Sequence, residues 1–167
     1  MRGSPRIEPL HLARRRGADA LLDIIEQLQG TPLPASLLET EVLPARLDQY
    51  DPGDLDAVMA IENVIYTHPW TRGNFVDSLA AQHHCRVLEW RGVIVGYCVL
   101  ANGADEAHLL NLSVAAAWQR RGLGRELLDH VLELARTLRA QKIFLEVRAS
   151  NNAARALYAQ SRFREIG

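Results

Sequence analysis

Residues 118–125, which read WQRRGLGR, decide how the rest of the sequence is interpreted. Two glycines stand two positions apart in this stretch, and an apolar periodicity typical of one helix face follows directly. That face is formed by Leu127, Leu128, Val131, Leu132, Leu134, Ala135 and Leu138. An apolar run with the sequence LLNLSV precedes the stretch at residues 109–114. The predicted order is therefore strand, glycine loop and long helix.

The glycine loop is suited to binding an anion. Small residues between a strand and a helix let backbone N–H groups converge without obstruction by Cβ atoms, and the helix dipole adds positive potential. Arg120 and Arg121 can add charge-assisted hydrogen bonds worth about 1.5–3 kcal/mol each. Two glycines at this spacing also occur in ordinary tight turns. The loop lacks the Gly-Lys-Ser/Thr ending of a P-loop and the third glycine of a dinucleotide fold.

Strand and helix patterns alternate on both sides of the loop. The expected strands are residues 45–50, a hairpin over 85–100 that turns at Arg91-Gly92, the run 109–114, residues 142–148, and the start of another strand at 163–167. The expected helices begin near Asp51-Pro52-Gly53-Asp54, at Thr71 as an N-cap with an end near Ala81, after Gly124, and at Asn151-Asn152.

Length and composition indicate one globular domain with an extension. The chain has 167 residues, of which 48% are hydrophobic and 23% charged, and it contains 7 Pro and 11 Gly. These values exclude a large multidomain protein, wholesale disorder and a fibrous repeat. Residues 1–42 differ from the rest: a basic start, an apolar cluster and a Pro-containing stretch predict one amphipathic helix and a linker. We assign the domain to residues 43–167.

Charge and cysteine content narrow the class of protein further. The formal net charge is −1, so no chain-wide positive field would hold nucleic acid. Two cysteines, Cys85 and Cys98, cannot form a disulfide framework, and we find neither a signal-peptide core nor a membrane-spanning run. We expect a cytoplasmic protein without membrane contact. His83, His84 and Cys85 are adjacent and cannot all point at one ion, so we expect no metal.

Several motifs together resemble a known family. Residues 119–124, QRRGLG, match the Gln/Arg-x-x-Gly-x-Gly/Ala signature of the GNAT superfamily of N-acetyltransferases. Residues 145–151, LEVRASN, followed by Ala156-Leu157-Tyr158, are similar to its RimI-type branch, which acetylates the N-terminal α-amine of a ribosomal protein. His68-Pro69-Trp70 and the bulged-strand sequence at 111–114 extend the resemblance to about residues 43–167. It implies an α/β acyl-CoA N-acyltransferase fold, with a mixed, mainly antiparallel sheet flanked by helices.

The resemblance also implies a binding mode for acetyl-CoA. In the family, coenzyme A lies where two central strands splay apart, with its pyrophosphate on the glycine loop and its pantetheine arm on the bulged strand. The corresponding groups here would be the backbone of Leu112, Ser113 and Val114, the loop residues Gln119, Arg120, Arg121, Gly122, Leu123 and Gly124, and Asn151 at the pantetheine end. A ligand with amide groups can satisfy strand N–H and C=O groups left unpaired by the splay.

The family pattern assigns catalytic roles to Glu146 and Tyr158. Glu146 would accept the proton of the acceptor amine, directly or through one water, if burial raises its pKa. Tyr158 would donate a proton to the departing thiolate, and a backbone N–H near Val114 would polarise the acetyl carbonyl. Spacing alone favours other roles: Glu146 could pair with Arg148, and Tyr158 could be a core aromatic residue.

The class of acceptor substrate and the C-terminal edge of the sheet each allow more than one interpretation. An α-amine has a pKa of about 7.7–8.0 and lysine about 10.4, so deprotonating lysine at pH 7 costs roughly 3.5 kcal/mol more. We expect a protein N-terminus as acceptor, with a small-molecule amine or CoA binding without turnover as alternatives. Ser161-Arg162-Phe163 replaces the family's Leu-Gly-Phe, which predicts either a strained or a reshaped turn. The family's last strand is missing, so we expect either a truncated form of the sequence or an exposed sheet edge that the N-terminal segment, a partner's strand or a second copy covers.

Overall fold

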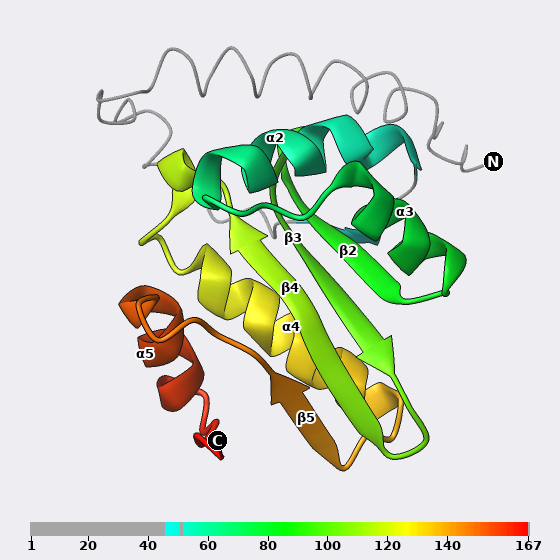
Figure 1. Ribbon diagram of the computed structural model, residues 1–167, viewed down its shortest axis with the longest axis vertical. Coiled ribbons are helices and arrows are strands. Elements are labelled where there is room, and N and C mark those ends of the chain that lie inside the picture. The colour runs from blue at the N-terminus through cyan, green and yellow to red at the C-terminus, as the bar shows by residue number, and fades with distance from the viewer. Residues whose placement is uncertain (1–45, 51, 167) are drawn as a thin grey trace, which may run out of the picture.

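The central feature of the fold is a five-stranded sheet in the order β1-β2-β3-β4-β5 (Figure 1). The computed structural model describes residues 46–50 and 52–166. The strands are β1 Arg46–Gln49, β2 His84–Trp90, β3 Val93–Asn102, β4 Glu106–Val114 and β5 Lys142–Leu145. Neighbouring strands are antiparallel except β4 and β5, which are parallel. The mixed, mainly antiparallel sheet expected from the sequence is confirmed.

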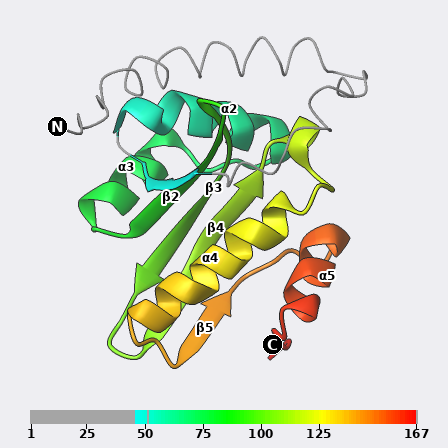
Figure 2. The same ribbon diagram turned by 180° about the vertical axis from the view of Figure 1, so that it is seen from behind.

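Helices cover both faces of this sheet. They are η2 Pro52–Asp54, α2 Leu55–Ile65, α3 Arg72–Ala80, η3 Ala116–Trp118, α4 Leu123–Thr137 and α5 Asn152–Gln160. Helices α2 and α3 lie on one face, and α4 crosses the opposite face, as the front and back views show (Figures 1 and 2). Within the part of the chain that the structure describes, no helix has the length and apolar character needed to cross a bilayer.

The core lies between the sheet and these two helical layers. Val87, Leu88, Val99 and Leu100 of the central strands are fully buried. The apolar face predicted for the long helix is confirmed at its centre, since Leu127, Leu128, Val131 and Ala135 are buried. Leu132, Leu134 and Leu138 from the same predicted face are only partly buried. Burying one such side chain contributes about 1.5–3 kcal/mol, so this helix face is a major part of the core.

Local sequence signals place the element boundaries well in the first half of the domain. Thr71 caps α3 in a reciprocal capping box with Asn74, as a polar residue before an apolar run predicts. Arg91 and Gly92 have φ values of 49° and 82°, the positive pair that a two-residue hairpin turn needs. Both predictions from the sequence are confirmed.

Two predicted strand segments are wrong. The strand expected over 142–148 ends at Leu145, because its pairing with β4 stops where Leu109 faces Leu145. The strand expected from Phe163 does not form in residues 163–166, which carry no regular structure. Residues 163–166 pair with no strand in the described part of the chain, and β5 remains the edge of the sheet there.

Helix α5 ends in a left-handed turn built on a non-glycine residue. Arg162 has φ +68°, its N–H bonds the carbonyl of Ala159 at 3.1 Å, and the N–H of Phe163 bonds that of Tyr158 at 3.0 Å. The rings of Tyr158 and Phe163 pack edge to face, with centroids 5.7 Å apart. This arrangement is a Schellman motif with its apolar contact, so the strain predicted at this turn is present at Arg162.

We predict that Arg162→Gly stabilises the protein by about 0.5–1 kcal/mol, because glycine adopts a positive φ without the Cβ penalty and this gain exceeds its extra unfolded-state entropy. Thermal unfolding should rise by about 2 °C. Ala156→Gly, in the exposed middle of the same helix, is the matched control and should destabilise by about 1 kcal/mol. An Arg162→Gly protein that melts below the wild type would contradict the assigned strain.

Candidate active site

The parallel pairing of β4 and β5 ends half-way along β4. Residues Glu106–Leu109 pair with Lys142–Leu145, after which β4 continues to Val114 while the chain after β5 turns away towards α5 (Figure 1). The outer edge of residues 110–114 therefore has no strand partner among the described residues. Backbone N–H and C=O groups on such an edge are available to a ligand that carries amides. Leu112, Ser113 and Val114, the strand residues that the sequence singled out, all lie on this edge.

A bulge in β4 marks the start of the open edge. Asn111 pairs with Val99 and Leu109 with Leu100, so Leu110 is an extra residue without a partner on β3. Its side chain is exposed. A bulge bends the strand and increases its local twist. The bend therefore coincides with the position at which β5 stops following β4.

The glycine loop follows the open edge after the short helix η3. The side-chain amide of Gln119 donates to the carbonyl of Val114 at 3.0 Å, which ties the loop to the end of β4. Arg120 and Gly122 have φ values of 60° and 83°, and both arginines of the loop are exposed. Helix α4 starts at Leu123 with Gly122 as its N-cap and no side-chain cap. The first N–H groups of α4 are thus left for another partner.

The loop leaves space for a ligand at Gly122, whereas a side chain on Gly124 would be in ordinary van der Waals contact with the protein. A Cβ built on Gly122 would meet nothing within 4 Å, whereas one on Gly124 would lie 3.5 Å from Leu157 Cδ2 and 4.0 Å from Val114 Cγ2. The start of α4 therefore contacts both α5 and the end of β4. Open space, uncapped amides and a helix N-terminus together fit the diphosphate of a nucleotide.

Tyr158 lies on α5, which the start of α4 contacts. Its side chain is half-buried, and this burial, with a smaller contribution from nearby Tyr66, raises its pKa to about 12. Asn151 is the N-cap of the same helix, and its side-chain oxygen accepts from the Ala154 N–H at 3.1 Å. Asn151 therefore fixes the start of α5 with its carbonyl group and keeps its amide donor for other contacts.

Glu146 directly follows the last residue of β5 and is exposed. The burial on which its predicted role as a base depended is therefore absent at this position. Because Glu146 lies beyond the last residue pair between β4 and β5, no neighbouring strand covers it. An exposed carboxylate at this position can still accept a proton, and it can do so through water.

Sequence reasoning missed a group of polar side chains on the other face of the open edge. This buried polar cluster consists of the buried residues Glu62, Tyr97 and Ser113 and the half-buried residues Tyr66 and Asn111. Glu62 is only 1% exposed, and its carboxyl group accepts from the hydroxyl of Tyr97, from Asn111 Nδ2 at 3.3 Å and from a backbone N–H. The sequence does contain a signal for the burial of Glu62, because this residue lies four positions after Val58 and one after Ile61, on the apolar face of α2.

The cluster reaches the open edge through Ser113 and Tyr66. Ser113 Oγ donates to Asn111 Oδ1 at 3.2 Å and lies 2.9 Å from the Tyr66 hydroxyl. Burial raises the pKa of Tyr66, and Arg148 lies close enough to lower it by its charge. Burial and the Glu62 carboxyl group raise the pKa of Tyr97. Both tyrosines are therefore neutral hydrogen-bond donors at physiological pH.

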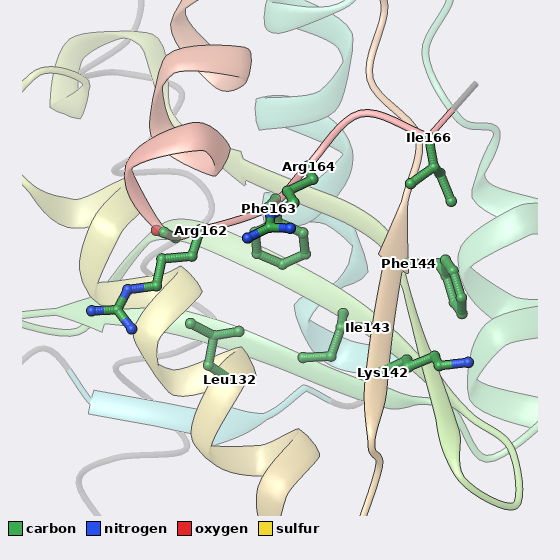
Figure 3. A pocket seen from close by; sticks show the side chains of 9 residues that line it. Leu132, Lys142, Ile143, Phe144, Arg162, Phe163, Arg164 and Ile166 are labelled. Carbon is green, nitrogen blue, oxygen red and sulfur yellow. The ribbon is translucent and has the colours of Figure 1, made fainter.

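A surface hollow lies at the start of β5 and is separate from these residues (Figure 3). It is lined by Leu132, Lys142, Ile143, Phe144, Ser161, Arg162, Phe163, Arg164 and Ile166. None of the site residues predicted from the sequence lines it. Cys85 and Cys98 are buried free thiols, and residues 46–50 and 52–166 contain no group of three or more His, Cys, Asp or Glu side chains able to hold a metal ion.

Comparison with known proteins identifies the family. The model of the acetyltransferase (GNAT) family matches residues 55–163, which contain the open edge, the glycine loop and α5. The chain belongs to the GNAT family of acetyltransferases. A second family model, the winged-helix domain of large helicase-related protein, matches residues 3–82. The described part of that match forms β1, α2 and α3 of the GNAT fold.

Relatives of this GNAT chain share one described activity. The ribosomal protein bS18-alanine N-acetyltransferase of Escherichia coli K12 is 35% identical over 112 residues, which are 67% of this chain and 76% of the relative. A Bacillus subtilis protein described as a putative enzyme of the same kind is 34% identical over 107 residues, 63% and 71% of the two chains. The crystal structure of the Escherichia coli enzyme superimposes with a TM-score of 0.69 at 32% identity, covering 73% of this chain and 79% of that one.

Proposed function

We propose that the protein transfers an acetyl group from acetyl-CoA to the N-terminal α-amine of a protein, of the ribosomal-protein alanine type. The observation that carries this proposal is the unpaired edge of β4, followed through η3 and the glycine loop by an uncapped helix N-terminus at Gly122. Such an edge can hold an amide-bearing arm next to a site for its diphosphate. Relatives with the same described activity at about 35% identity supply the acceptor class.

The residues of the open edge and the glycine loop are proposed to hold the coenzyme. Backbone groups of Leu112, Ser113 and Val114 would bind its amide-bearing arm, and Asn151 would contact the end of that arm. The amides of Arg120, Arg121, Gly122, Leu123 and Gly124 would surround the diphosphate, and Gln119 would hold the loop in place through its bond to Val114. When bound, acetyl-CoA supplies an activated acetyl thioester and a thiolate leaving group. The free space at Gly122 fits this placement.

Glu146 and Tyr158 are proposed to move the two protons of the reaction. Glu146 accepts the proton of the acceptor ammonium group through water, and a modest base suffices because an α-amine has a pKa of only about 7.7–8.0. Tyr158 donates its hydroxyl proton to the leaving sulfur. Its pKa of about 12 keeps that proton in place at neutral pH. A backbone N–H near Val114 stabilises the developing oxyanion.

Glu146→Gln should lower kcat about 100-fold near neutral pH while leaving the affinity for coenzyme A unchanged, because the base would be lost but not the phosphate site. Steady-state kinetics and calorimetry measure the two quantities. Glu133→Gln is the matched control, since Glu133 is an exposed partner of Arg136 on α4 and should have no effect on either. An unchanged rate in the Glu146→Gln protein would remove Glu146 as the base.

A peptide beginning Ala-Arg tests the proposed reaction directly. Mass spectrometry after incubation with acetyl-CoA should find one acetyl group on the α-amine and none on a peptide whose N-terminus is blocked. Acetylation of polyamines or aminoglycosides but not of the peptide would indicate a small-molecule acetyltransferase. Binding of coenzyme A without any product would indicate a binding module.

We also propose that residues 43–167 form the acetyltransferase domain and residues 1–42 an extension to it. The GNAT match lies within 55–163, and β1 extends the same sheet to Arg46. The winged-helix match to residues 3–82 crosses this boundary. The shared sheet favours assigning the described part of that overlap to the acetyltransferase domain.

A further inference from the structure

The carboxyl group of Glu62 is the buried acidic group nearest the open edge that the proposed transfer does not use. It lies in the last turns of α2 and accepts the backbone N–H of Trp70 at 2.6 Å. It also accepts from Tyr97 on β3 and from Asn111 on β4. A buried carboxyl group is tolerated only when such donors surround it. Glu62 therefore joins the connection between α2 and α3 to two strands of the sheet.

That connection, residues 66–71, is anchored near both of its ends, to β4 at its start and to α2 near its end. At its start the hydroxyl of Tyr66 lies 2.9 Å from Ser113 Oγ, and near its end Trp70 N–H reaches Glu62. The two anchors are linked to each other, because Ser113 donates to Asn111 and Asn111 donates to Glu62. One continuous hydrogen-bonded chain thus fixes the whole connection.

The connection borders the open edge on the face opposite the glycine loop. Ser113 contacts Tyr66 of the α2 side, whereas the next residue, Val114, approaches Gly124 of α4 on the other side. Successive side chains of a strand point to opposite faces of the sheet, so Ser113 and Val114 contact different helices. Arg148 acts to lower the pKa of Tyr66, and Tyr66 contributes to raising the pKa of Tyr158, so both residues lie near the start of the connection. The face of the edge left for an acceptor is therefore the one that residues 66–71 border.

We propose that Glu62 is a positioning residue that fixes residues 66–71 as the acceptor-side wall of the site. The inference rests on the proposed function, since it assigns one wall of the same site to the acceptor. Between the anchors, Thr67 and His68 are exposed and share a hydrogen bond of 3.1 Å, so their side chains are available to a bound peptide. A carboxyl group suits this position because its oxygens receive three donors without presenting a competing N–H.

Glu62→Gln tests the proposal with little change in shape. The amide must turn one N–H towards Tyr97 and Asn111 or towards Trp70, which loosens the connection without opening a cavity. With the Ala-Arg peptide we expect the acceptor KM to rise about tenfold, while the KM for acetyl-CoA and kcat change less than twofold. Tyr66→Phe removes only the hydroxyl at the other anchor and should raise the acceptor KM about threefold.

A matched control breaks a different link between the same two helices. Asp56 of α2 accepts from Arg72 of α3 at 2.6 Å at the surface, and Asp56→Asn should leave all three kinetic constants unchanged. A loss of thermal stability in Glu62→Gln and Tyr66→Phe with an unchanged acceptor KM would show a merely structural role and overturn the inference. An equal rise in both KM values would overturn it as well. Failure of the wild-type protein to acetylate the peptide would instead overturn the proposed function, and this inference with it.

Discussion

Tyr158→Phe is expected to lower kcat about 100- to 1,000-fold without changing the affinity for coenzyme A. The substitution removes the one group on α5 proposed to protonate the leaving sulfur. It keeps the aromatic ring, whose edge-to-face contact with Phe163 holds the end of the helix. Single-turnover rates and calorimetric affinities, measured on the same preparation, separate the chemical step from binding.

A second tyrosine provides the control for losing a hydroxyl group. Tyr50 is 1% exposed and lies beside β2, at the side of the sheet opposite β5. Tyr50→Phe should leave kcat within about twofold of the wild-type value. If Tyr158→Phe retains more than half of the wild-type kcat, Tyr158 is a packing residue, as its position beside Leu157 suggests from sequence alone.

The pH dependence follows from the same hydroxyl. A pKa of about 12 means that Tyr158 keeps its proton at every pH below that value. The rate should therefore rise as the α-amine of the acceptor deprotonates, through about 7.7–8.0, and then stay level up to about pH 10.5. A fall in rate with an apparent pKa below 10 would contradict Tyr158 as the proton donor.

The sequence predicted those parts of the fold that local chemistry determines. Thr71 begins α3 because its side chain and that of Asn74 satisfy each other's backbone N–H groups. The hairpin turns at Arg91-Gly92 because both residues take a positive φ. The apolar face around Leu127 and Leu128 is buried because its spacing is helical. Each of these signals lies within a few residues of the structure that it specifies.

The predictions that were wrong depend on contacts distant in sequence. The side chains of residues 146–148 alternate in character as in a strand, but a strand needs a partner, and the pairing of β5 with β4 stops next to the bulge at Leu110. The same loss of a neighbour leaves Glu146 exposed. The buried polar cluster was missed because Glu62 and Ser113 are 51 positions apart, and only the packing of α2 on the sheet brings them into one network.

Gly122→Val is expected to weaken coenzyme A binding about 100-fold, because a branched side chain would fill the space proposed for the diphosphate and displace the first amides of α4 from it. A Cβ at this position meets no protein atom within 4 Å, so the loss would come from the ligand site and not from a clash within the fold. Calorimetric titration with coenzyme A measures it.

Gly122→Val also strains the backbone. A second glycine of the chain allows this strain to be separated from the loss of the ligand site. Gly122 has φ +83° and Gly92, in the β2–β3 turn, has φ +82°, so valine is strained to a similar degree at either position. Gly92→Val should lower the melting temperature as Gly122→Val does but leave the dissociation constant for coenzyme A unchanged. If the two variants bind coenzyme A equally well, the uncapped start of α4 is not where the diphosphate lies, and the open edge of β4 loses its assignment to the amide-bearing arm.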